Sequence, residues 1–140
     1  MYPLANIPVM QLSLDLSQQP EYHFKLGHSL KALREQGILI VGSGNIVHNL
    51  RRISWEENAK PFDWALEFDQ VVKDQILKRD YRLLFSEATE TAAGKLSVPT
   101  PEHYYPLLYI LGASDQDEAV AFVYEGIQNA SISMTSVVFG

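Results

Sequence analysis

Residues 38–45 read Ile-Leu-Ile-Val-Gly-Ser-Gly-Asn and join a short apolar run to a glycine-rich turn. Four apolar residues bounded by turn residues are typical of a strand that is buried on both faces. The glycines allow backbone conformations that other residues avoid, so the chain can turn sharply where the strand ends. We therefore expect a buried strand at Ile38–Val41.

A further strand and a helix are predicted before this stretch. Ile7–Asp15 alternates in part between apolar and polar residues, as a half-buried strand does. Leucines then recur with the spacing of one helical face, at Leu26, Leu30 and Leu33. Gly37 stands where a helix commonly ends. Strand, helix and strand in this order predict a βαβ unit with a parallel strand pair.

The rest of the chain predicts further helices and then an antiparallel strand pair. The expected helices are Pro61–Leu77, a short helix within Asp80–Ser97 that ends at Gly94, and Thr100–Leu111, kinked at Pro106. The expected strands are Ala119–Tyr124 and Ser131–Phe139. These elements predict an α/β fold, a mixed β-sheet flanked by helices, formed by residues 1–140 as a single domain.

The composition excludes several classes of function. The chain is 46% hydrophobic and 20% charged, as in globular proteins, and its net charge of −6 offers no footprint for nucleic acid or an anionic membrane. It has no cysteine, so any metal ligands must be His, Asp, Glu or backbone oxygen. Its apolar runs are too short to cross a bilayer and its first residues do not resemble a signal peptide, so we expect a cytoplasmic protein.

Two histidines are candidates for chemistry. His48 follows the predicted strand and the glycine turn, where ligands gather in open α/β sheets. His103 falls in the first turn of a predicted helix, where the helix dipole favours the neutral, metal-binding imidazole. The alternatives are a surface-loop histidine and a capping histidine. His23 and His28 are assigned to structure or solvent, because residues five apart do not share a helical face.

The most specific patterns lie in residues 7–13 (Ile-Pro-Val-Met-Gln-Leu-Ser), 42–50 (Gly-Ser-Gly-Asn-Ile-Val-His-Asn-Leu) and 99–108 (Pro-Thr-Pro-Glu-His-Tyr-Tyr-Pro-Leu-Leu). Together they resemble the C-terminal half of the 4,5-DOPA extradiol dioxygenases. These are class III extradiol ring-cleaving enzymes related to the B subunit of protocatechuate 4,5-dioxygenase. The resemblance extends over essentially the whole chain.

The resemblance implies an activity and a site. The activity is extradiol cleavage of a DOPA-like catechol with O₂ at a mononuclear non-haem metal, iron(II) as the working metal, with zinc(II) able to take its place. His48 and His103 correspond to histidines of the family's metal site, and His48 is also a candidate acid/base for the catechol. Apart from the resemblance, we hypothesise from their positions beside His48 that Asn45 and Asn49 orient His48 or the substrate.

The resemblance also implies that the chain carries only half of the catalytic domain, as a truncated or split product. The family's N-terminal half supplies further metal-binding histidines, and no segment here matches them. We therefore expect a partner chain equivalent to that half, or a homo-oligomer that completes the site. The alternative is a non-catalytic α/β remnant or a binding protein of the same fold, similar to the Memo-like relatives.

Overall fold

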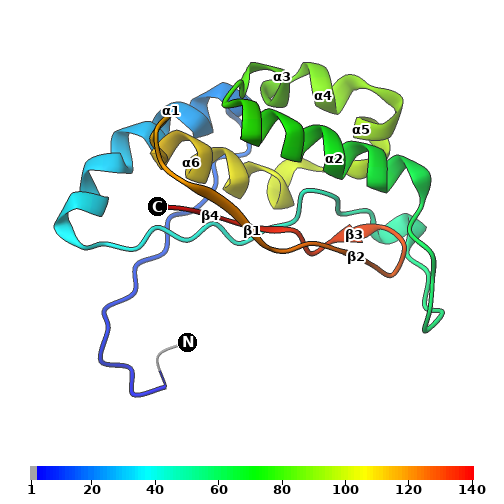
Figure 1. Ribbon diagram of the computed structural model, residues 1–140, viewed down its shortest axis with the longest axis horizontal. Coiled ribbons are helices and arrows are strands. Elements are labelled where there is room, and N and C mark those ends of the chain that lie inside the picture. Colours follow the sequence, from blue (N-terminus) through cyan, green and yellow to red (C-terminus); the bar gives the residue numbers. More distant parts are fainter. Residues whose placement is uncertain (1–2) are drawn as a thin grey trace.

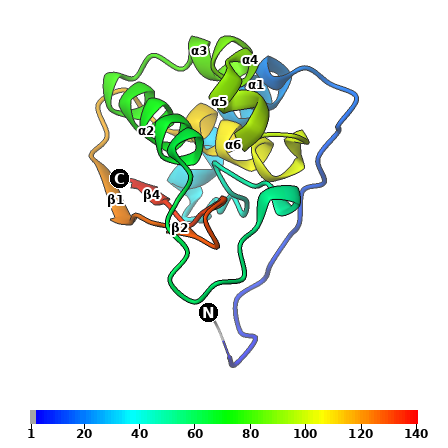
Figure 2. The ribbon, with the colours of Figure 1, turned by 90° about the vertical axis from the view of Figure 1, so that its right-hand side faces the viewer.

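The computed structural model describes residues 3–140, in which a layer of helices covers a layer of strands (Figure 1). The helical layer contains α1 to α6, and the strand layer contains β1 to β4 together with the extended segment 38–45, drawn in cyan. An end-on view places α6 between the other helices and the strand layer (Figure 2). Among residues 3–140, no helix is long and apolar enough to cross a membrane.

Helix α1 (Pro20–Leu30) packs closely against α6 (Tyr105–Ala113). The contact requires glycine on both sides. A Cβ added to Gly27 would lie 2.2 Å from the carbonyl oxygen of Tyr109, and one added to Gly112 would lie 2.1 Å from that of Phe24. The 3₁₀ helix η1 (Lys31–Gln36) continues α1 and ends at Gly37, whose φ of 76° is left-handed, as predicted for the end of this helix.

Helix α2 (Asp63–Lys78) is the longest element, and it confirms the helix predicted from residue 61 to 77. Its buried face carries apolar side chains with helical spacing, namely Ala65, Phe68, Val72 and Ile76. Where one short helix was predicted after it, the chain forms three: α3 (Arg82–Phe85), α4 (Glu87–Glu90) and α5 (Ala92–Ser97). Gly94 lies inside α5 instead of ending a helix, because the Thr91 hydroxyl accepts from the Gly94 amide and caps a new start.

The helix predicted at Thr100–Leu111 is divided. The 3₁₀ turn η3 (Pro101–His103) is followed by α6, and Pro106 occupies the first turn of α6. At that position proline loses no helical hydrogen bond, so it begins a helix where we expected it to kink one. Helix α6 continues past Gly112 to Ala113.

The strands form two small antiparallel sheets. β1 (Val120–Tyr124) pairs with β4 (Ser136–Phe139), and β2 (Ile127–Gln128) pairs with β3 (Ile132–Ser133). The α/β class is confirmed, and so is the antiparallel relation of the two C-terminal segments.

The predicted strands at Ile7–Asp15 and Ile38–Val41 are wrong for the structure of this chain, and so is their parallel pairing. Both segments lack strand partners, and every strand pair within residues 3–140 is antiparallel. Leu39 and Val41, expected to be buried, are 69% and 62% exposed. An apolar, extended segment becomes a strand only when a neighbour supplies hydrogen bonds to its backbone.

Candidate histidine site

His48 is held by backbone contacts on both sides of its chain. Its amide donates to the Ser97 carbonyl at the end of α5 (2.9 Å), and it forms an isolated antiparallel bridge with Ile132 of β3. The preceding residue, Val47, is fully buried and accepts from the amide of Ser133 (2.9 Å). The backbone at His48 is therefore fixed between the helical layer and the strand layer.

His103 ends the short turn η3 and lies beside the glycine-rich segment. Its carbonyl accepts from the amide of Asn45 (2.8 Å). A Cβ added to Gly44 would lie 2.1 Å from the same carbonyl oxygen, so only glycine fits this contact. The Gly-Ser-Gly-Asn stretch thus packs directly against the backbone of His103, and this contact brings the two histidine motifs together.

The two histidine rings stack face to face. The ring centroids of His48 and His103 are 3.6 Å apart and the planes are inclined by 23°. Both side chains are half-buried. Imidazole lone pairs lie in the ring plane, so stacked rings present their nitrogens side by side and do not aim them at one point. The two stacked rings would therefore not serve equally well as ligands of one metal ion.

The site favours a neutral imidazole at His48. Burial lowers the pKa of His48, the neighbouring His103 lowers it further, and the Glu102 carboxylate partly opposes them. The pKa of Glu102 is itself lowered, first by the hydrogen bond from the Thr100 hydroxyl (2.7 Å). A neutral imidazole has the free lone pair needed to accept a proton or bind a metal.

Asn45 and Asn49 direct their side chains to the backbone. The Asn45 amide donates to the carbonyl of Ser133 (2.7 Å). The Asn49 amide donates to that of Leu96 (2.7 Å), and its side-chain oxygen accepts from the Arg51 amide (3.1 Å). Both asparagines therefore position the chain around His48. Asn45 also lines, with His103, an open trough of about 390 Å³.

A buried carboxylate was not among the predicted site residues. Asp69 on α2 accepts from the Ser133 hydroxyl (2.5 Å) and the Thr135 hydroxyl (3.2 Å), and Lys73 lies 3.5 Å away. Asp69 and Lys73 are four residues apart on one helical face, which places an acid and a base side by side. The signal in the sequence is that Asp69 falls on the apolar face of α2, four residues after Ala65 and three before Val72. Asp69 fixes β3, which in turn holds residues 47 and 48.

The remaining histidines are structural or exposed, as predicted. His23 is fully buried between α1 and α6, where Nδ1 lies 3.1 Å from the Tyr109 hydroxyl and the ring packs at a tilt against Tyr105, with 4.2 Å between the ring centroids. His28 is exposed. Within residues 3–140, no group of three or more His, Asp or Glu side chains is arranged to hold a metal ion. His48 and His103 supply two nitrogen donors, which suit iron or zinc but do not complete a site.

Comparison with known proteins places the chain in a family. Residues 1–140 match the family described as the catalytic LigB subunit of aromatic ring-opening dioxygenase. The chain belongs to the LigB family. It is 44% identical over its whole length to a 4,5-DOPA dioxygenase extradiol from Escherichia coli K12 and 33% identical over 99% of its length to one from Portulaca grandiflora.

The LigB relatives are longer than this chain. The match covers 52% of the E. coli protein and 51% of the Portulaca protein, so the chain spans about half their length. The crystal structure of an uncharacterized E. coli K12 protein, 44% identical, superimposes with a TM-score of 0.90 over 98% of this chain and 57% of that one. The fold described above therefore agrees closely with one half of a longer LigB-type structure.

Proposed function

We propose that this chain supplies one half of an extradiol dioxygenase site that opens the ring of a DOPA-like catechol with O₂. The observation that carries the proposal is the stacked, half-buried pair of His48 and His103, 3.6 Å apart. Each lies in a motif that resembles one of the family, and the fold brings together histidines that are far apart in the sequence. Such convergence of titratable groups is typical of active sites.

The geometry supports a division of roles between the two histidines. His48 is the proton acceptor for a catechol hydroxyl, because its lowered pKa keeps the imidazole neutral near physiological pH. His103 is the nitrogen ligand of the metal, since it borders the open trough while the stacked planes prevent equal ligation by both rings. Asn45 and Asn49 hold the backbone that carries His48.

The expected metal is iron(II), with zinc(II) able to occupy the same donors. Iron(II) accepts imidazole nitrogen and offers open positions for catechol oxygens and O₂. Because the described residues provide no third ligand group, the remaining ligands would come from the half of the LigB domain outside the span matched here.

The proposal is tested by completing the site. The chain is co-expressed with the portion of the E. coli relative that lies outside the matched span, purified, and loaded with iron(II) without oxygen. We expect about one iron per complex, and ring opening of DOPA, seen as a yellow product, when O₂ is admitted. His103→Ala should lose iron, and His48→Gln should keep iron while turnover falls about 10²–10⁴-fold.

His28→Ala is the matched control, because this histidine is exposed and lies outside the site. It should retain both iron and turnover. A complex that binds iron and turns over at the normal rate without His48 and His103 would refute the assignment. Loss of iron in His48→Gln would show that His48 is a ligand, against the division of roles.

A non-catalytic binding protein of the same fold is the second candidate. It is favoured by one observation, that residues 3–140 contain no complete ligand group for a metal. It predicts that the completed complex binds neither iron nor zinc stoichiometrically and leaves DOPA unchanged.

A further inference from the structure

The extended segment 39–44 has an unpaired backbone. Hydrogen bonds hold it only at its ends, from the Ile38 amide to the Leu33 carbonyl (3.2 Å) and from the Asn45 amide to the His103 carbonyl (2.8 Å). Between these points, no backbone hydrogen bond joins residues 39–44 to any other part of the described chain. The segment nevertheless runs straight within the strand layer (Figure 1). It has the form of a strand but has no partner.

The unpaired edge of β4 faces this segment across the trough. The trough is lined by residues 38–42 and 44–46, by residues 135–139, and by side chains of α6 that include Leu107 and Ile110. β4 uses its other edge to pair with β1. A strand laid along the trough would therefore meet unpaired backbone on both sides and an apolar floor.

The N-terminal arm, residues 4–14, adds a second unpaired segment. It leaves the body of the molecule in both views (Figures 1 and 2), and no backbone hydrogen bond holds it before the turn at Asp15. Its apolar side chains as far as Leu12 are exposed, with Val9 at 85% and Met10 at 96%, and only Leu14 at its end packs against the core. The alternation of apolar and polar residues that predicted a strand here is thus not matched by any strand partner in the described chain. Isolated strands with exposed apolar residues are sites for pairing with another segment.

The size of the relatives indicates what covers these segments. The E. coli relative has nearly as much chain outside the matched span as inside it, since the match covers 52% of its length. The solved structure superimposes on 98% of this chain with a TM-score of 0.90, and the matched part is 57% of that longer chain. The fold of this chain is therefore close to that of the matching part of a longer chain, which fits a surface shaped to receive the rest of the domain.

We propose that the trough and the N-terminal arm form the docking surface for the complementary half of the LigB domain. Residues 39–44, and residues of the arm, become strands by pairing with strands of that half. The inference rests on the proposed function only in naming the partner, and it requires neither metal nor catechol. The surface also places the partner beside His103, which borders the same trough.

The test measures docking directly, in the absence of metal and catechol. The chain is co-expressed with the non-matching portion of the E. coli relative, and the complex is characterised by mass and by amide hydrogen exchange. We expect a one-to-one complex in which exchange of the amides of residues 39–44 slows by about a hundred-fold or more relative to the chain alone. Leu39→Lys, which places a charge in the trough wall, should weaken the complex about ten-fold or more.

Leu77→Lys is the matched control, because Leu77 on α2 is 60% exposed and Leu39 is 69% exposed. It should leave the affinity unchanged. Failure to form a complex, or a complex that leaves residues 39–44 unprotected or tolerates Leu39→Lys, would overturn the proposal. A dimer of the chain alone with these amides protected would also overturn it, since the occupant would be a second copy. A complex that forms as expected but shows no turnover would refute the proposed function alone.

Discussion

Asp69 lies on the buried face of α2, and its carboxylate joins that helix to the connection between β3 and β4. The side chain is 8% exposed and accepts hydrogen bonds from the hydroxyl groups of Ser133 and Thr135. Removing the carboxylate leaves the buried Ser133 hydroxyl without its acceptor. We therefore expect Asp69→Ala to lower the free energy of unfolding by about 2–3 kcal/mol in urea titrations.

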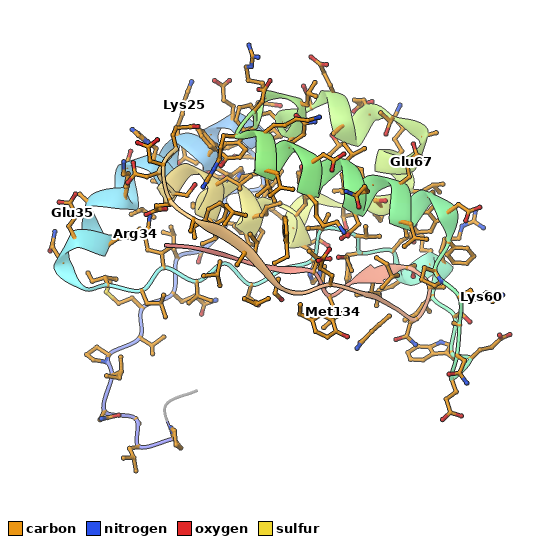
Figure 3. The ribbon with its side chains drawn as sticks, viewed as in Figure 1. Lys25, Arg34, Glu35, Lys60, Glu67 and Met134 are labelled. Carbon is orange, nitrogen blue, oxygen red and sulfur yellow. The ribbon has the colours of Figure 1, made fainter. Side chains whose placement is uncertain are left out.

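Glu67→Ala is the control for Asp69→Ala. Glu67 is on the same helix but is exposed at the outer face of the molecule (Figure 3), so its loss should change the stability by no more than about 0.5 kcal/mol. Equal effects of the two substitutions would mean that the Asp69 network does not stabilise the strand layer.

Gly44 is the second residue on which the site depends. A methyl group at this position would lie 2.1 Å from the backbone carbonyl oxygen of His103, which cannot move without η3. We expect Gly44→Ala to cost about 1–3 kcal/mol of stability and to separate the stacked rings of His48 and His103. Shifts of the imidazole C–H resonances in NMR spectra would report the separation.

Gly126→Ala is the comparison for Gly44→Ala. The nearest atom to a Cβ at Gly126 is 3.4 Å away, in the Tyr124 ring, so the methyl group fits at ordinary contact distance. This variant should leave the two histidine resonances in place. If Gly44→Ala leaves them in place as well, the glycine contact does not position His103.

At the scale of elements, Arg34 ties three segments together. From η1, its guanidinium donates to the Ala113 carbonyl at the end of α6 (2.8 Å), lies 2.6 Å from the Glu118 carboxylate, and reaches the Phe139 carbonyl on β4 (3.5 Å). We expect Arg34→Met to destabilise the protein by about 1–3 kcal/mol, because the buried ends of these elements lose a charged donor.

Lys25→Met tests whether loss of any positive charge has this effect. Lys25 projects outward from α1 (Figure 3), and its ion pair with Glu21 is largely exposed to solvent. Exposed pairs contribute little, so thermal unfolding should change by far less than in Arg34→Met. Similar losses in both variants would contradict the role of Arg34 as a link between elements.

The elements that the sequence predicted correctly are those whose partners lie within the chain. Helix α2 and the C-terminal antiparallel strands bury their apolar faces against nearby elements, so their periodicity was sufficient. Residues 38–41 carry an equally strong strand pattern but have no neighbour to pair with. Periodicity reports what a segment can become, and pairing depends on a partner that a single segment does not specify.

The candidate site was also predicted only in part from the sequence. The motifs drew attention to His48 and His103, and the fold brings their rings together. Sequence alone did not find the contacts that hold them, because the Ser133 hydroxyl and the Asp69 carboxylate are 64 residues apart. The face-to-face stacking was also beyond prediction, since it depends on the close approach of Gly44 to the His103 carbonyl.

At the scale of the whole molecule, the buried His23 and the half-buried His48 make stability depend on pH. Burial lowers the pKa of His23 and of His48 below the ordinary value of 6.5. A hydrogen bond with the Gln18 backbone partly opposes this shift at His23, and the Glu102 carboxylate partly opposes it at His48. The unfolded chain therefore binds protons more readily than the folded chain as the pH falls through 6.5, so the free energy of unfolding should decrease there.

The carboxylates of Glu102 and Glu118 affect the stability in a separate, more acidic pH range. The pKa values of Glu102 and Glu118 are lowered from 4.5, so the stability that these groups contribute is present above that pH and is lost below it. A loss of stability between pH 7.5 and 5.5 can therefore be assigned to histidines. Urea titrations across this range measure the slope of stability against pH, which does not depend on the absolute stability of a variant.

His23→Gln and His48→Gln should each reduce this slope, and the double variant should reduce it further, because a glutamine takes up no proton. His28→Gln, which removes a histidine from the same helix as His23, controls for the loss of a histidine as such. A slope that is unchanged in the double variant would show that neither imidazole is kept neutral by the fold. It would also remove the reason for assigning the proton acceptor to His48.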